Sequence, residues 1–136
     1  MCDKLDKVEE FAVDLEHHAY RTYQGFTCLI QISTRSEDFI IDTLVLRSEL
    51  GLLNRSFTNP TIVKVLHGSD NDTLWLQRDF GVYIVNLFDS GQAARLLEYP
   101  RLSLAYLLEK FCNITTDKKK FQLADWRIRF VPLLLI

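Results

Sequence analysis

The sequence predicts an α/β fold with a mixed sheet of about five strands, an antiparallel meander followed by parallel crossovers, flanked by helices. Three observations predict it. Short turns join three β-rich runs near the N-terminus, which is typical of a meander. Later apolar runs alternate with helical patterns, as parallel strands do when helices connect them. The chain has 136 residues, 48% of them hydrophobic, which suffices for one domain with a buried core.

The three N-terminal strands are expected at residues 11–16, 26–32 and 38–42. Within the first of them, alternate side chains should point to opposite faces of the sheet. One face would carry Phe11, Val13 and Leu15, and the other Ala12, Asp14 and Glu16. The polar residues 3–9 are expected to form a short helix or an arm.

Helical spacing of apolar residues predicts a helix over residues 43–57, which Asn59-Pro60 ends. A strand at 62–66 should lead into a helix that ends near Gly81, with Leu74, Trp75 and Arg78 on one face.

A short fifth strand is expected at residues 82–87. Asp89 and Ser103 are typical N-caps for two further helices, one through Leu97 and one through Phe111. This order of elements is that of a ribonuclease-H-like fold.

Composition excludes few functions. The net charge of −2 gives no indication of nucleic-acid binding, although carboxylates that cluster around cations make a nuclease look acidic. Cys2, Cys28 and Cys112 are widely spaced and are expected to be reduced thiols, with Cys28 and Cys112 buried. No leader and no membrane-length apolar run is visible, so we expect a protein of the cell interior that does not bind membranes.

Asp14 and Glu16 are the first candidates for chemistry. Two acids at positions i and i+2 of a strand point to the same face, where both carboxylates can approach one hard cation. The alternative is a strand face that is simply solvated, and on these two residues alone it is the commoner explanation.

Asp72 is the third candidate, because it follows the fourth strand, at the edge where open α/β sheets bind ligands. The alternative is structural: Ser69 and Asp72 have the spacing of a capping box at the start of a helix.

Several spaced blocks together resemble the exosome component 10 family of ribonuclease-D-like exonucleases with four catalytic acids, over residues 8–129. The first block is Val13-Asp14-Leu15-Glu16-His17-His18, with Gln31-Ile32-Ser33-Thr34-Arg35 on the next strand. The second is Val63-Lys64-Val65-Leu66-His67-Gly68, followed by Asp72 and Trp75-Leu76-Gln77. Phe88-Asp89 and Gln122 to Arg129 continue the similarity. A series of this kind is far more specific than a lone pair of acids.

The resemblance implies 3′–5′ hydrolysis of RNA ends with two Mg²⁺ or Mn²⁺ ions, with exosome subunits as partners and the nucleus, including the nucleolus, as location. Asp14, Glu16 and Asp72 would be catalytic residues and metal ligands. Substrate contacts would come from Leu15, His17, His67 and Trp75. For His17, a hydrogen-bonded surface position is an equal alternative.

The chain departs from the family's pattern at its end. The third motif, a Tyr followed four residues later by an Asp, should come beyond Arg129, where the apolar stretch 130–136 stands instead. We therefore expect an incomplete exonuclease domain at 1–129 without its C-terminal helices, a truncated form that is weak or inactive. The alternative is a non-catalytic fragment that binds nucleic acid or the exosome through Lys118-Lys119-Lys120, Arg127 and Arg129. A solvated loop is the simpler interpretation of those lysines.

Overall fold

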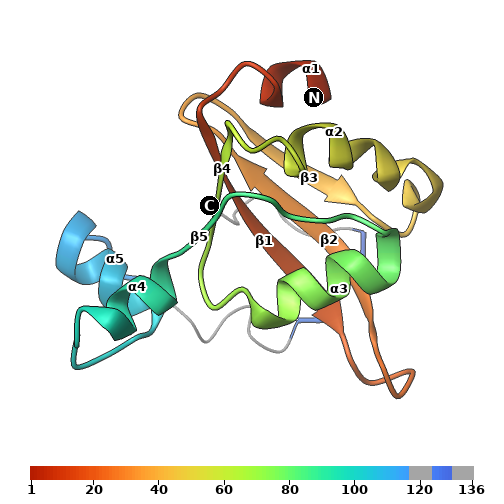
Figure 1. The fold of residues 1–136 in the computed structure, drawn as a ribbon. Helices are drawn as coiled ribbons and strands as arrows, with labels where there is room; N and C mark the ends of the chain where they lie inside the picture. The colour runs from red at the N-terminus through yellow and green to blue at the C-terminus, as the bar shows by residue number, and fades with distance from the viewer. Residues whose placement is uncertain (117–123, 130–136) are drawn as a thin grey trace.

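The computed structural model describes residues 1–116 and 124–129, and its centre is a five-stranded sheet in the order β3-β2-β1-β4-β5 (Figure 1). The strands are β1 Glu10–His18, β2 Phe26–Ser33, β3 Asp38–Asp42, β4 Val63–Leu66 and β5 Leu87–Asp89. The helices are α1 Cys2–Leu5, the 3₁₀ helix η1 Arg47–Leu53, α2 Asn54–Phe57, α3 Asp70–Phe80, α4 Ser90–Leu96 and α5 Leu104–Cys112. The stretch 130–136 and the three lysines at 118–120 lie outside the described residues.

The central strand is β1, which pairs antiparallel with β2 and parallel with β4. The meander continues antiparallel into β3, and β5 extends the sheet parallel to β4. This mixed pattern confirms the predicted fold class, including its ribonuclease-H-like order.

One face of the sheet carries the hydrophobic core. Phe11, Val13 and Leu15 are buried on it, as the alternation in the sequence predicts. Helices α1, α2 and α3 and the 3₁₀ helix supply Leu5, Phe57, Leu76, Leu50 and Leu53 to the same cluster. The rings of Phe11 and Phe57 lie 5.2 Å apart, within the range for favourable aromatic pairs. Asp14 therefore points to the opposite face, away from this core.

The α4–α5 hairpin lies beyond β5, to one side of the sheet (Figure 1). Its N-caps are as predicted: Asp89 accepts from the amides of Gly91 and Gln92, and Ser103 accepts from that of Tyr106. Between the two helices lies an apolar groove of about 290 Å³, lined by Phe88, Ala93, Ala94, Leu97, Leu104, Leu107, Leu108 and Phe111 among others.

The helix expected over residues 43–57 is wrong in its first half. The carboxylate of Asp42 accepts from the amides of Leu44 and Val45, which holds the chain in a turn. A 3₁₀ segment and only one α-helical turn follow. The strand expected at 82–87 is also misplaced. Asn86 has a left-handed backbone (φ 61°) that redirects the chain, so only Leu87–Asp89 joins the sheet.

Two smaller expectations need correction. On α3 the fully buried apolar side chain is Leu76, whereas Leu74 is exposed. Cys28 is buried as expected, but Cys112 is exposed on α5. In the part of the chain that the structure describes, no helix has the length and apolar character to cross a membrane.

Candidate active site

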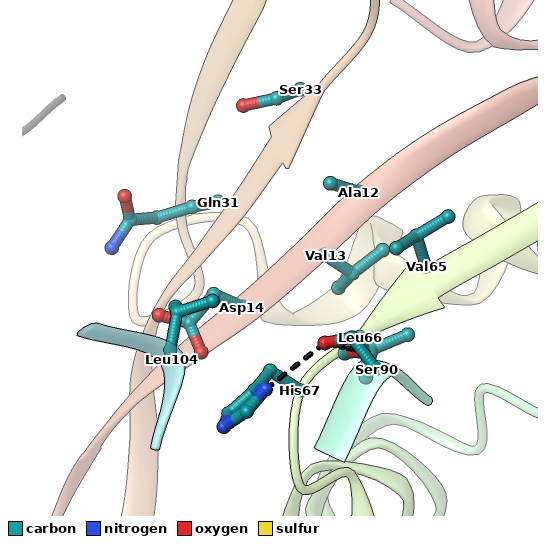
Figure 2. Close-up of a pocket in the computed structure, with 10 residues that line it drawn as sticks. All are labelled: Ala12, Val13, Asp14, Gln31, Ser33, Val65, Leu66, His67, Ser90 and Leu104. Atoms are coloured by element: carbon teal, nitrogen blue, oxygen red, sulfur yellow. Dashed lines mark hydrogen bonds between the residues drawn. The ribbon is translucent and has the colours of Figure 1, made fainter. Parts of the chain in front are cut away.

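Asp14 and Glu16 project from β1 on the face opposite the core. The register places Asp14 opposite Gln31 of β2, and the side-chain amide of Gln31 donates to Glu16 Oε1 at 2.9 Å. Asp14 and Gln31 line a pocket of about 210 Å³, shown in Figure 2, together with Ser33 of β2, His67 and Ser90. Pairing with β2 thus places Asp14 in the lining of the pocket and holds the Glu16 carboxylate through Gln31.

Asp72 reaches the site from the first turn of α3. Asp72 is only 8% exposed. Ser69 is the N-cap residue, but its hydroxyl donates to Asp89 and makes no hydrogen bond to an amide of the helix. The capping-box interpretation of Ser69 and Asp72 is therefore wrong, and the burial of Asp72 needs another explanation.

The pKa values of all three carboxyls are raised. Burial, followed by repulsion from Asp14, raises the pKa of Glu16 to about 7. The same two causes raise the pKa of Asp72 to about 7. Burial also raises the pKa of Asp14, against the opposing effects of the Leu15 amide and His67. Such repulsion is costly in a folded protein unless a cation neutralises it, which marks a functional site.

A divalent cation fits this set of donors. Mg²⁺ prefers oxygen ligands, keeps several waters, and is commonly held by only one or two carboxylates together with substrate phosphates. Within residues 1–116 and 124–129, no three His, Cys, Asp or Glu side chains are close enough to hold a metal by themselves. The arrangement therefore suits ions that water and a phosphate help to coordinate.

Asp89 ties two elements of the site together. Its Oδ1 accepts from the amides of Gly68 and Gly91 at 2.9 and 2.8 Å, and its Oδ2 accepts from the amide of Ser69 at 2.8 Å. Although burial alone would raise it, the hydrogen bonds from Ser69 and Gly68 hold the pKa of Asp89 well below its usual value. One carboxylate thus caps α4 and fixes the loop from which α3 presents Asp72.

Replacing Asp89 with alanine is expected to cost about 2–3 kcal/mol of stability, because an N-cap and charge-assisted hydrogen bonds are lost together. Chemical denaturation measures the loss. The control is Asp70→Ala, since Asp70 is an exposed acid in the first turn of α3. Equal stabilities of the two variants would contradict the anchoring role of Asp89.

His67 lies in the same pocket (Figure 2), where Ser90 orients its ring. The Ser90 hydroxyl donates to the carbonyl of Leu66 at 3.1 Å and lies 2.9 Å from His67 Nδ1. Ser90 thus holds the ring at Nδ1 and makes no contact with Nε2.

His17 is partly buried against α3. Its ring stacks on Trp75 of α3, with centroids 4.0 Å apart and planes 8° apart. On its other side, a Cβ added to Gly25 would come within 2.0 Å of His17 Cε1, so only glycine fits there. Burial, followed by repulsion from Arg78, lowers the pKa of His17.

Leu15 lies between the two acids of β1 but points into the core, where it is 6% exposed. Only its backbone faces the site region. The structure thus gathers Asp14, Glu16, Asp72 and His67 at one edge, and pairs His17 with Trp75 beside it.

Sequence reasoning missed Gln31 and Ser90 as site residues and gave Asp89 only a capping role. Gln31 could have been found from the alternation along the second strand, which places it beside the acids. No sequence signal indicates the hydrogen bonds that reach from Asp89 to Gly68 and Ser69, since they span about twenty residues.

The basic residues of the alternative binding surface are paired with acids where they are described. Arg127 Nη2 lies 2.6 Å from Asp125 Oδ2, and Arg129 Nε lies 2.6 Å from Asp42 Oδ2. An acid of the chain thus already offsets the charge of each guanidinium.

A family model described as a 3′–5′ exonuclease matches residues 1–134. Human exosome complex component 10 is 62% identical over 130 residues, which cover 96% of this chain and 15% of that protein. The chain therefore spans less than a fifth of the length of this curated relative.

Two solved structures share the fold. The catalytic core of RRP6 from Trypanosoma brucei has a TM-score of 0.93 at 51% identity, covering 97% of this chain and 36% of that one. RNase D of Escherichia coli, described as an exoribonuclease involved in structured RNA processing, has a TM-score of 0.87 at 26% identity, covering 96% and 34%. The resemblance inferred from the sequence is confirmed.

Proposed function

Because the chain belongs to the 3′–5′ exonuclease family, we propose that it carries the site for metal-dependent removal of nucleotides from RNA 3′ ends. The observation that supports this most strongly is the group of three acids, Asp14, Glu16 and Asp72. Burial raises the pKa values of all three, and repulsion from Asp14 raises those of Glu16 and Asp72 further. A cleft that concentrates negative charge in this way is suited to divalent cations and, through them, to phosphate.

The family's exonucleases depend on metal ions, and we propose two Mg²⁺ or Mn²⁺ ions here. Asp14 and Glu16 would hold one, Asp14 would bridge to the second, and Asp72 would support the second through water. When bound, such a pair activates a water and stabilises the departing 3′ oxygen. Gln31 holds the Glu16 carboxylate in place through its 2.9 Å hydrogen bond.

We propose that the remaining site residues contact the terminal nucleotide. The backbone of Leu15 is available there, while its side chain is not. The stacked pair of His17 and Trp75 offers an aromatic edge beside the acids. His67, which Ser90 holds at Nδ1, would use Nε2 for a hydrogen bond to the terminal nucleotide.

RNA as substrate, the exosome as partner and the nucleus as location are proposals that rest on the relatives. Human exosome complex component 10 carries the complex in its name, and the bacterial RNase D structure is described as an exoribonuclease. Residues 1–129 would form the exonuclease domain within whatever assembly the chain joins.

We expect the 136-residue polypeptide alone to cleave slowly. The family's pattern uses a fourth acid and a Tyr, and these 136 residues contain no Tyr followed four positions later by Asp. Absence of one catalytic group commonly costs about 10²–10⁴-fold in rate.

The test is the polarity and chemistry of cleavage. Purified chain in excess over 5′-labelled single-stranded RNA should shorten it one nucleotide at a time when Mg²⁺ or Mn²⁺ is added, and not in EDTA. The same RNA with a blocked 3′ end serves as control. Internal cuts, or equal cleavage of the blocked RNA, would exclude exonuclease action. Binding of RNA without any metal-dependent shortening would favour the non-catalytic alternative.

A further inference from the structure

The hairpin loop between β1 and β2 carries the most exposed aromatic side chains near the site. Tyr20 is 82% exposed and Tyr23 is fully exposed, with Arg21 between them. Figure 1 shows the loop extending past the end of the sheet, beyond α3. Large aromatic side chains are costly to leave in water, so two of them on one loop need an explanation.

The base of this loop is held by α3. Arg78 Nη1 donates to the carbonyl of Gln24 at 2.9 Å, while Asp79 fixes the Arg78 guanidinium through Nε at 2.7 Å. Asp79 also accepts from the amide and hydroxyl of Thr27, both at 3.1 Å. The tip is therefore presented from a fixed stem.

Tyr20 is oriented while its face stays open. Its ring meets the ring of His18 edge-on, with centroids 5.7 Å apart. His18 is itself buried, which makes it a fixed support. A ring that is 82% exposed and held by one neighbour is suited to stacking against a flat ligand.

The loop directly continues the strand of the acids. Tyr20 follows Glu16 by four residues, a reach of about 13 Å along an extended chain. His17 and Trp75 stack between the acids and the loop base. A single strand whose 3′ end lies at Asp14 and Glu16 can thus contact the tip without leaving the surface.

We propose that Tyr20 and Tyr23 stack on bases of single-stranded RNA upstream of the terminal nucleotide, with Arg21 paired to the backbone phosphate between them. This inference rests on the proposed function, since it places the RNA 3′ end at the acids. Stacking on aromatic rings tolerates any base, which suits an enzyme that shortens RNA of varied sequence.

The experiment is equilibrium binding of a short 5′-fluorescein-labelled oligoadenylate to the whole chain in EDTA, followed by anisotropy. Y20L and Y23L should each weaken binding by about 5- to 150-fold, the factor for one lost base stack. Y20F and Y23F should bind like the wild type, because phenylalanine stacks without the hydroxyl. R21Q should lower the slope of log affinity against log salt by about 0.7, the value for one phosphate on a single strand.

The matched control is Y83L, because Tyr83 is also an exposed tyrosine but follows the C-terminus of α3, where Asn54 binds its amide. Thermal unfolding checks that each variant is folded. If the Leu variants bind RNA as tightly as the wild type, the loop proposal is overturned while the proposed function stands. Phe variants as weak as the Leu variants would overturn stacking. Wild-type chain that binds no RNA would overturn the loop proposal and the proposed function together.

Discussion

Replacing Asp14 with asparagine is expected to lower metal-dependent cleavage of single-stranded RNA by about 10²–10⁴-fold. Asp14 is the acid whose charge acts on both of the others, since it raises the pKa of Glu16 and of Asp72. Its loss removes the proposed bridging ligand but leaves the shape of β1 intact, because asparagine is isosteric. Single-turnover rates with the chain in excess over labelled RNA measure the effect.

Asp38→Asn is the control for Asp14. It makes the same substitution on the edge strand β3, where the side chain is exposed and lies opposite Ser33 of β2. D38N should cleave like the wild type. Equal rates for D14N and the wild type would show that any cleavage observed comes from another site or from a contaminant.

Metal affinity is expected to rise steeply with pH, by about tenfold for each of Glu16 and Asp72 between about pH 6 and pH 8. Both carboxyls have pKa values of about 7, so most are protonated at the lower pH and must lose their protons to bind a cation. Two such groups together allow about a hundredfold change. Calorimetric titration with Mn²⁺ at the two pH values measures it.

E16Q should remove about half of this pH dependence on a logarithmic scale, and it should weaken the site at both pH values. Q31A should instead keep the pH dependence and move it to higher pH, because it removes no titrating group but loses the hydrogen bond that lowers the pKa of Glu16. A Mn²⁺ affinity that is flat between the two pH values would contradict the raised pKa values and, with them, the closeness of the three acids.

The same pKa shifts predict how the metal-free chain responds to pH. The pKa of Glu16 rises from 4.5 to about 7 on folding. Between pH 4.5 and about pH 7, the folded state therefore binds more protons than the unfolded state. Protonated Glu16 therefore contributes its full stabilisation below about pH 4, and this contribution is lost as the pH rises through about 7. The contribution is about 1–2 kcal/mol after allowance for solvent screening.

The part of the site carried by β1 could be predicted from the sequence, because strand alternation is strict. Once Phe11, Val13 and Leu15 are assigned to the core, Asp14 and Glu16 must share the other face. The N-caps Asp89 and Ser103 were equally predictable, since each side chain bonds to amides only two or three residues away.

Elements in which a polar side chain overrides the apolar pattern could not be predicted. The first half of the expected helix at 43–57 gave way to a turn because Asp42 accepts from Leu44 and Val45. The fifth strand moved because Asn86 has a left-handed backbone and donates to the carbonyl of Pro60. In both cases a tertiary or side-chain hydrogen bond outweighed the local apolar pattern.

The central claim is that Asp14, Glu16 and Asp72 form one metal site, and locating Mn²⁺ by anomalous scattering from crystals of the chain tests it most directly. We expect manganese peaks beside the Asp14 and Glu16 carboxylates, with a second peak between Asp14 and Asp72, and none in D14N crystals treated in the same way. Well-ordered crystals in millimolar Mn²⁺ at about pH 8, where the acids are ionised, with no manganese at these three residues would contradict the claim.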